Sequence, residues 1–155
     1  MQKRPVVTDE IISNACKIVA ERNQIGDPSL LEEHYEYHGM TGKALAFKLA
    51  SKEGWEYGIE IDDKLIDELD SIYDIAEKEL NGLVEQWYLE NKNDLVILEN
   101  GTKIKFKGSK GEIEEGVIRG IWQYGIAKYI VHDMTQTEDD KNGKLVNFED
   151  VEKVE

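Results

Sequence analysis

The chain has 155 residues, of which 33 are acidic and 19 are Lys or Arg, so its formal net charge at pH 7 is -14. This length suits one globular unit or two small ones. The electric field of so negatively charged a protein repels phosphates, which argues against nonspecific nucleic-acid binding by the whole molecule. No apolar run approaches the roughly 18 residues that a membrane helix needs, and the first ten residues lack the apolar core of a signal peptide. We therefore expect a cytoplasmic protein without a membrane partner.

The residues that usually carry out catalysis or bind metals are scarce. Cys16 is the only cysteine and there are three histidines, which rules out an internal disulfide framework and nearly excludes a zinc ribbon or a Cys/His nucleophile. No phosphate-binding glycine motif and no nucleophile-elbow motif is present. The sequence therefore predicts a non-catalytic protein without catalytic residues, cofactor or metal, in which Cys16 is a thiol of the core.

The negative charge belongs mainly to the first part of the chain. Residues 1–100 contain 22 acidic residues against 10 Lys and Arg, a net charge of -12. Residues 101–155 contain 11 against 9, a net charge of -2. An acidic surface of this kind attracts basic partners, although it also serves to keep a protein soluble.

Three segments near the N-terminus have the apolar spacing of short helices. Residues 8–23 begin with Thr8 as an N-cap, and a second helix begins at Asp27 and Pro28 and is expected to end near Gly39. Thr41 is the N-cap of a third helix. The side chains expected to pack from this third helix are Leu45, Phe47, Leu49 and Ala50.

Residues 62–91 predict one long helix, because apolar residues recur there at three- and four-residue steps. After Asn93 the pattern changes to alternation, which is typical of strands. We expect a strand from Asp94 to an Asn100–Gly101 hairpin turn, and then a strand that directs Ile104 and Phe106 to one side and its lysines to the other. Further strands are expected within residues 116–122, 126–133 and 144–148.

The segments NGTKIKFKGSKGEIEEGVIRGIW (residues 100–122), KYIVHD (128–133) and LVNFEDVEKVE (145–155) combine short strands, a Gly-rich first loop and a terminal acidic turn. In this respect the last third of the chain resembles an SH3-like small β-barrel of the KOW or Tudor type. Such barrels bind proteins, RNA or DNA or are purely structural, so the resemblance implies a fold and leaves the function open. The predicted protein is α+β, with an acidic helical domain at residues 1–92, built around one long helix, and an SH3-like barrel at 94–155.

The long helix carries the strongest candidate for a binding site. Residues 60–79 contain nine carboxylates and two lysines, and four of the aspartates recur at steps of four, three and four residues. On a helix these four side chains form one ridge, which we call the acidic ridge: Asp63, Asp67, Asp70 and Asp74. Such a ridge is either a solvated face or a docking face for a basic protein surface, and spaced carboxylates can imitate the phosphates of a nucleic acid.

A basic stripe in the β part gives a second candidate. Its lysines project from one strand face, where nearby aromatic rings could stack on bases, or they could simply be solvated or protect a sheet edge from aggregation. The residues of this alternative nucleic-acid site are Lys103, Lys105, Lys107, Lys110, Trp122 and Tyr124.

Two weaker patterns point to metal chemistry. His34 and His38 lie four residues apart, the spacing at which two imidazoles on one helix share a metal, but a surface role is the simpler interpretation. Carboxylates spaced as in DELDSIYD (residues 67–74) are similar to those of the magnesium-binding helices of all-α NTP pyrophosphatases, without a second acidic helix to complete the site.

The sequence therefore favours a non-catalytic protein whose acidic helical face binds a basic surface of a partner protein. Small acidic proteins of this kind are similar to phage or plasmid inhibitors of nucleic-acid-handling machinery, some of which act as nucleic-acid mimics. The alternative is a nucleic-acid-associated regulator that uses the lysines of the barrel, and a magnesium-dependent pyrophosphatase-like enzyme is a minor alternative. The sequence leaves open whether the protein forms a homodimer.

Overall fold

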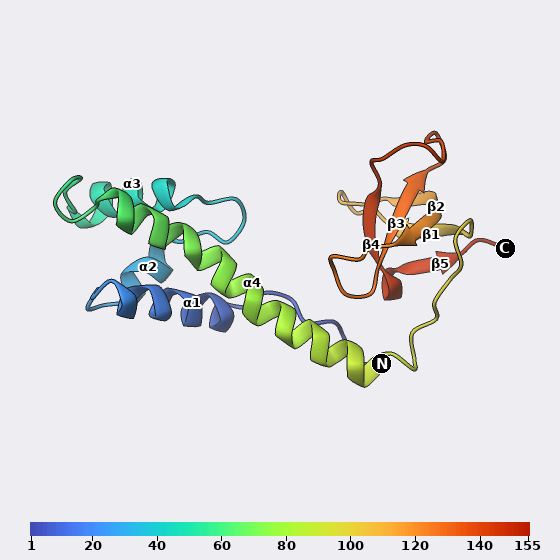
Figure 1. The fold of residues 1–155 in the computed structure, drawn as a ribbon, viewed down its shortest axis with the longest axis horizontal. Helices are drawn as coiled ribbons and strands as arrows, with labels where there is room; N and C mark the ends of the chain where they lie inside the picture. Colours follow the sequence, from blue (N-terminus) through green and yellow to red (C-terminus); the bar gives the residue numbers. More distant parts are fainter. The chain divides into compact units, whose positions relative to one another are not determined.

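The computed structural model describes all residues, 1–155, and contains N-terminal helices followed by a curled antiparallel sheet (Figure 1). This confirms the predicted α+β class. The chain divides into two compact units, one formed by Arg4–Leu83 and the other by Met1–Lys3 with Val84–Glu155. The sequence predicts a domain boundary between residues 92 and 94. The boundary between the two compact units instead falls inside the long helix, between residues 83 and 84.

Four α-helices precede the sheet: α1 at Asp9–Arg22, α2 at Ser29–His34, α3 at Gly42–Glu53 and α4 at Asp63–Asn91. The predicted caps of α1 and α3 are confirmed. The hydroxyl of Thr8 accepts a hydrogen bond from the backbone N–H of Ile11, and that of Thr41 accepts one from Ala44. Each cap satisfies one of the N–H groups that the first turn of a helix leaves without a partner.

Helix α2 is shorter than predicted, because it ends at His34 rather than near Gly39. Tyr35 leaves the helical conformation, with φ -77° and ψ 133°, and its ring enters the core of the helical unit, where only 9% of the residue is exposed. The side chain of a large apolar residue gains more from burial than from another turn of helix. His38 therefore does not share a helix with His34, and the predicted pairing of these histidines on one helix face is wrong.

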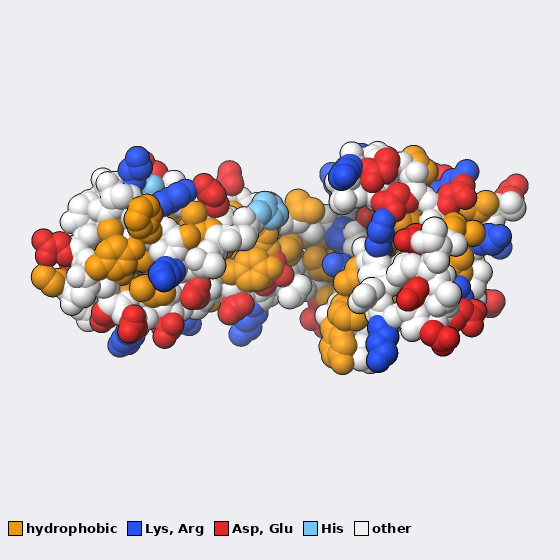
Figure 2. Space-filling model, turned by 90° about the horizontal axis from the view of Figure 1, so that it is seen from above, with side chains coloured by type: hydrophobic (Ala, Val, Ile, Leu, Met, Phe, Trp, Pro, Cys, Tyr) orange, Lys and Arg blue, Asp and Glu red, His pale blue; other side chains and the backbone are white.

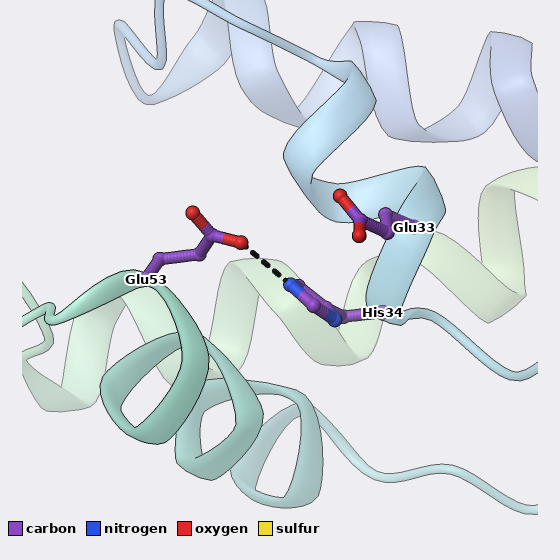
Figure 3. A group of neighbouring side chains, drawn as sticks. All are labelled: Glu33, His34 and Glu53. Carbon is purple, nitrogen blue, oxygen red and sulfur yellow. Dashed lines mark hydrogen bonds and ion pairs between the residues drawn. The ribbon is translucent and has the colours of Figure 1, made fainter.

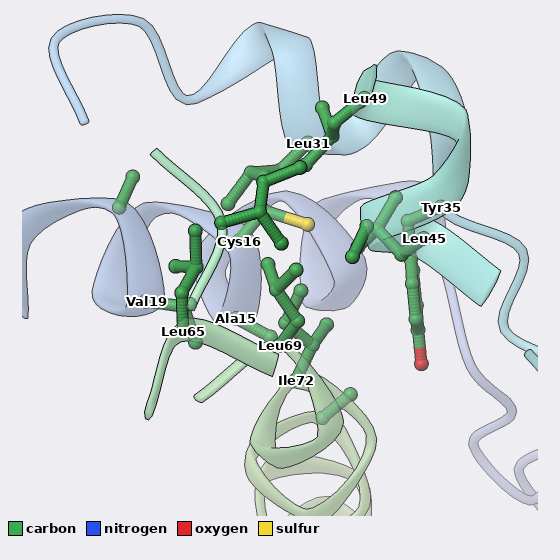
Figure 4. Packing of buried hydrophobic residues seen from close by; sticks show 14 of the residues in the cluster. Ala15, Cys16, Val19, Leu31, Tyr35, Leu45, Leu49, Leu65, Leu69 and Ile72 are labelled. Carbon is green, nitrogen blue, oxygen red and sulfur yellow. The ribbon is translucent and has the colours of Figure 1, made fainter. Parts of the chain in front are cut away.

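The core of the helical unit forms where α1, α2 and α3 meet the first half of α4 (Figure 4). Leu65, Leu69 and Ile72 recur along one face of α4 and are buried, as the apolar periodicity predicted. Cys16 is fully buried in the same cluster, which confirms that it is a core thiol. Phe47 was expected to pack but is 65% exposed, because it lies on the opposite side of α3 from Leu45 and Leu49.

The second unit contains a curled sheet of five antiparallel strands, which together form a half-barrel. The strands are β1 (Lys103–Lys107), β2 (Ile113–Ile121), β3 (Lys128–Asp133), β4 (Lys144–Asn147) and β5 (Val151–Lys153), in the order β4-β3-β2-β1-β5. Ile104, Phe106, Ile118, Tyr129 and Val131 fill its inner face and are buried.

The expected strand between Asp94 and Asn100 does not form, and this prediction is wrong. Both sides of β1 are occupied, by β2 and β5, so the preceding segment has no free edge of β1 with which to pair. Side-chain and turn contacts hold the segment instead: the N–H of Leu98 donates to the hydroxyl of Tyr129 (2.7 Å) and that of Gly101 donates to the carbonyl of Ile118 (2.7 Å). The Asn100–Gly101 turn exists, with Gly101 at φ 87°, but it does not join two strands.

None of the helices is both long and apolar enough to cross a membrane.

Candidate functional site

The acidic ridge lies on the side of α4 that faces away from the core. All four of its aspartates are exposed, while Leu65, Leu69 and Ile72 of the same helix are buried. No ion pair or hydrogen bond engages the carboxylates of Asp63, Asp67 and Asp74. The lysines that do form ion pairs, such as Lys48 with Glu36, lie elsewhere. Three of the four predicted residues therefore present carboxylates that the chain itself does not neutralise.

Asp70 differs from the rest of the acidic ridge. Its Oδ1 accepts a hydrogen bond from the backbone N–H of Gly42, at the first turn of α3. A carboxylate at this position satisfies an N–H group of the helix start and lies at the positive end of its dipole. Asp70 therefore has a structural task, joining α3 to α4, that the even spacing of the four aspartates did not reveal.

Aromatic side chains lie beside the acidic ridge. The ring of Tyr73 stacks on that of Tyr37, with 5.4 Å between centroids, and Tyr37 also meets the imidazole of His38 edge to face at 5.0 Å. Tyr73 is 44% exposed and directly precedes Asp74 in α4. The sequence did not predict this group, because Tyr73 falls within the apolar periodicity of residues 62–91, while Tyr37 and His38 were expected to lie on the second helix.

Acidic side chains lie over both units on the face shown in Figure 2, where they are mixed with basic and apolar ones. The net charge is nevertheless uneven, since Arg4–Leu83 contains 18 acidic residues against 8 Lys and Arg, a net of -10. The other unit contains the remaining 15 against 11, a net of -4.

The lysines of β1 point outward and alternate with buried Ile104 and Phe106, as predicted. However, β1 lies between β2 and β5, so its lysines do not protect a sheet edge, and that interpretation is wrong. The register places Lys105 opposite Glu115 on one side and Glu152 on the other, and its Nζ lies 3.6 Å from Glu115 Oε1. Neighbouring carboxylates thus offset part of the positive charge of this strand.

Lys107 and Lys110 lie at the opposite end of β2 from Trp122 and Tyr124. Lys107 pairs with Ile113 at the end of β2 that adjoins the turn containing Lys110. Trp122 and Tyr124 follow the opposite end of β2 and pair edge to face, with 5.1 Å between ring centroids. At about 3.3 Å per strand residue, the nine steps from Ile113 to Trp122 separate these groups by at most roughly 30 Å, since β2 has a register shift between Ile118 and Gly120. The half-barrel therefore does not gather them into one surface.

The half-barrel has a pocket of about 630 Å³ beside β4 and the end of β1. Buried Phe106 contributes to its wall, and Lys144 forms an ion pair with Glu114 at its margin. The ammonium of Lys144 also lies 5.9 Å from the centroid of the Phe106 ring. Two of the four charged side chains that line the pocket, Lys144 and Glu114, are thus engaged with each other, and Asp150 accepts a hydrogen bond from the side chain of Asn147.

A larger pocket, of about 770 Å³, lies in the helical unit between the end of α1, the end of α3 and the start of α4. Its lining includes the indole of Trp55 and charges of both signs, among them Arg22, Lys64, Glu60 and Asp62. The pocket is separate from the acidic ridge. Its mixed charges do not indicate one class of ligand.

The structure brings together one group of metal-ligand side chains, at the ends of α2 and α3 (Figure 3). His34 Nε2 lies 2.8 Å from Glu53 Oε1, and the carboxylate of Glu33 lies nearby, so that the three ligand atoms are within 4.8 Å of one another. None of these residues lies on α4, where the pyrophosphatase-like alternative would place its magnesium ligands. His38 is not part of the group.

Two ionisable side chains, Cys16 and Tyr35, are buried in the core of the helical unit, and burial keeps both of them protonated near neutral pH. Burial, together with the charge of Glu32, raises the pKa of the Cys16 thiol to about 12, so the thiol stays protonated and is a poor nucleophile. Burial raises the pKa of Tyr35 to about 12 as well, with smaller contributions from neighbouring acidic groups.

No protein-family model, no curated protein and no solved structure matches the chain.

Proposed function

We propose that the helical unit binds a basic surface of a partner protein through the exposed aspartates of α4. The observation that carries this proposal is that Asp63, Asp67 and Asp74 are exposed on one helix and are paired with no cation of the chain. Like charges at steps of four and three residues repel, and a cationic partner would remove that repulsion.

The aromatic group beside the ridge supports a protein partner. Tyrosine is enriched at protein interfaces because its ring offers apolar contact area while its hydroxyl stays hydrated. The exposed ring of Tyr73 is held by its stack on Tyr37, so it would lose little conformational freedom on binding. An arginine of the partner could stack on this ring and pair with Asp74.

Mimicry of a nucleic acid is a narrower form of the same proposal, and it fits less well. Asp63 and Asp74 are eleven residues apart, or about 16 Å along a helix. Duplex DNA carries one charge for about every 1.7 Å of its axis, which amounts to roughly ten charges over that length. An inhibitor of the phage or plasmid type would therefore need carboxylates from other helices to imitate DNA.

In this proposal the half-barrel makes a second contact with the same partner protein, in addition to that of the acidic ridge. Its strand order and curvature are compatible with a small barrel, and we infer that it serves as an SH3-like module of the KOW or Tudor kind. The alternative, a regulator that binds nucleic acid through this unit, has less support, because Lys105 is paired and the aromatic residues lie far from Lys107 and Lys110.

The test compares two variants that each remove three negative charges from the helical unit. One changes Asp63, Asp67 and Asp74 to Asn and leaves Asp70 in place, because Asp70 holds α3. The control changes Glu10, Glu21 and Glu56 to Gln, three exposed carboxylates outside α4. Partners are captured from a lysate by the immobilised wild-type protein, identified by mass spectrometry and purified, and their affinities are measured by calorimetry.

At about 0.5–1 kcal/mol for each exposed charge pair, the ridge variant should bind the purified partner roughly 10- to 150-fold more weakly. The control should lose less than about a third of that free energy, and wild-type binding should weaken as salt is added. Equal losses in both variants would mean that only net charge matters, and the assignment of the ridge would then be wrong.

A further inference from the structure

We propose that Glu33, His34 and Glu53 form a binding site for a divalent zinc ion, which would join the ends of α2 and α3. The three side chains come from two different helices and direct one imidazole nitrogen and two carboxylates toward a common point (Figure 3). This site is independent of the acidic ridge and of the proposed partner.

The distances between the donor atoms are close to those that zinc requires. Zinc binds imidazole nitrogen and carboxylate oxygen at about 2.1 Å, so donors at a tetrahedral angle lie about 3.4 Å apart. His34 Nε2 and Glu53 Oε1 are 2.8 Å apart and would need to separate slightly. The Glu33 carboxylate, within 4.8 Å of both, would need to approach by at most about 1.4 Å, through rotation about its side-chain bonds.

The local electrostatics also favour a cation. Glu33 has no hydrogen-bond or ion-pair partner, so the group contains two carboxylates and only one of them, that of Glu53, is paired with the imidazole. Glu53 is the last residue of α3, a helix of 12 residues, and the C-terminal end of a helix attracts positive charge. The imidazole of His34 is 13% exposed, so water screens its side of the site less than at an open surface, whereas Glu33 and Glu53 are exposed residues.

The donor set selects the class of metal. One imidazole with two carboxylates suits zinc, whereas magnesium and calcium prefer oxygen ligands alone. Water would complete the coordination, since the group supplies three ligands. The only thiol cannot compete for the metal, because Cys16 is buried and its pKa is raised to about 12.

The experiment titrates zinc chloride into the full-length protein, freed of metal and of any histidine tag, and follows the heat of binding. Wild type should bind one zinc ion per chain, and zinc should raise the melting temperature, because it binds the folded state. Glu33→Gln and His34→Ala should each weaken binding by roughly tenfold or more. His38→Ala is the matched control, since this exposed histidine lies outside the group, and its affinity should equal that of wild type.

Glu33→Gln is the decisive variant, because Glu33 forms no bond within the protein and its substitution leaves the fold intact. Circular dichroism confirms that each variant keeps its helices. Failure of wild type to bind zinc, or an unchanged affinity in Glu33→Gln, would overturn the proposal. The same conclusion follows if magnesium chloride binds as tightly as zinc, because binding would then reflect general attraction to an acidic surface.

Discussion

Asp67 and Asp70 lie one turn apart on α4 and carry the same functional group, yet only Asp70 forms a bond within the protein. The difference arises from what lies beside them. Gly42 brings the start of α3 close to Asp70, while nothing bonds to the carboxylate of Asp67. A surface of similar residues thus contains members with different tasks, and a binding study that substitutes all four aspartates would mix a loss of affinity with a loss of stability.

Tyr35 shows a second effect at the scale of one residue. Its hydroxyl is buried and has no hydrogen-bond partner in the structure. An unsatisfied buried polar group costs about 1–3 kcal/mol, whereas the ring itself fills the core. Tyr35→Phe should therefore raise the free energy of unfolding by about 1 kcal/mol, as measured by urea denaturation near neutral pH. Tyr57→Phe is the control, because Tyr57 is 51% exposed, and it should leave the free energy of unfolding unchanged.

The same variant changes the response of the protein to alkali. Burial raises the pKa of Tyr35 from 10.0 to about 12 and that of Cys16 from 9.0 to about 12 in the folded protein. The unfolded chain therefore loses these protons first, and stability falls as pH rises from about 9 to 12, by up to about 1.4 kcal/mol per pH unit and group. Tyr35→Phe should remove the part of this loss that begins near pH 10. If the free energy of unfolding of the variant fell with pH as steeply as that of wild type, the raised pKa of Tyr35 would be contradicted.

At the scale of elements, the packing of α3 on α4 depends on Gly42. A β-carbon at this position would lie 2.6 Å from the backbone nitrogen of Asp70 and would collide with the carbonyl of Ile66. Gly82, also within the limits of a helix, has nothing within 4 Å of its missing β-carbon. Substitution by alanine should therefore change the free energy of unfolding in opposite directions at the two glycines.

Gly42→Ala should lower the free energy of unfolding by about 1–3 kcal/mol, because α3 must move away from α4. Gly82→Ala should raise it by about 0.5–1 kcal/mol, since alanine has the higher helix propensity and meets no obstacle. Urea denaturation followed by circular dichroism measures both. Similar losses in the two variants would show that the contact of α3 with α4 is not the cause.

The elements differ in how far the sequence could predict them. The caps at Thr8 and Thr41, the apolar face of α4 and the alternation of β1 are local patterns, and all were confirmed. The early end of α2 and the missing strand before β1 depend on contacts with residues distant in sequence: the core that takes up Tyr35 and the two partners of β1. For the same reason no local pattern could indicate that Glu53 would meet His34.

At the scale of the whole molecule, the net charge of -14 should make the protein repel nucleic acids and other polyanions. Neither unit is positive, and neighbouring carboxylates partly offset the basic strand β1. We expect no binding of a fluorescent single-stranded oligonucleotide at low salt, measured by anisotropy, and no change when Lys103, Lys105 and Lys107 become Gln. Binding that falls steeply with salt and is lost in this variant would favour the nucleic-acid alternative instead.

The half-barrel ends on two unclosed borders, since β4 and β5 each have a single neighbouring strand. Such borders can template the addition of strands from other molecules, the first step toward fibrils. Here the borders offer only four residues in β4 and three in β5, fewer than the roughly six that a stable zipper requires. Lys153 of β5 adds repulsion between copies, whereas the charge of Lys144 in β4 is offset by its ion pair with Glu114. The short length of β4 and β5, more than their charge, should thus limit the addition of strands from other molecules to this sheet.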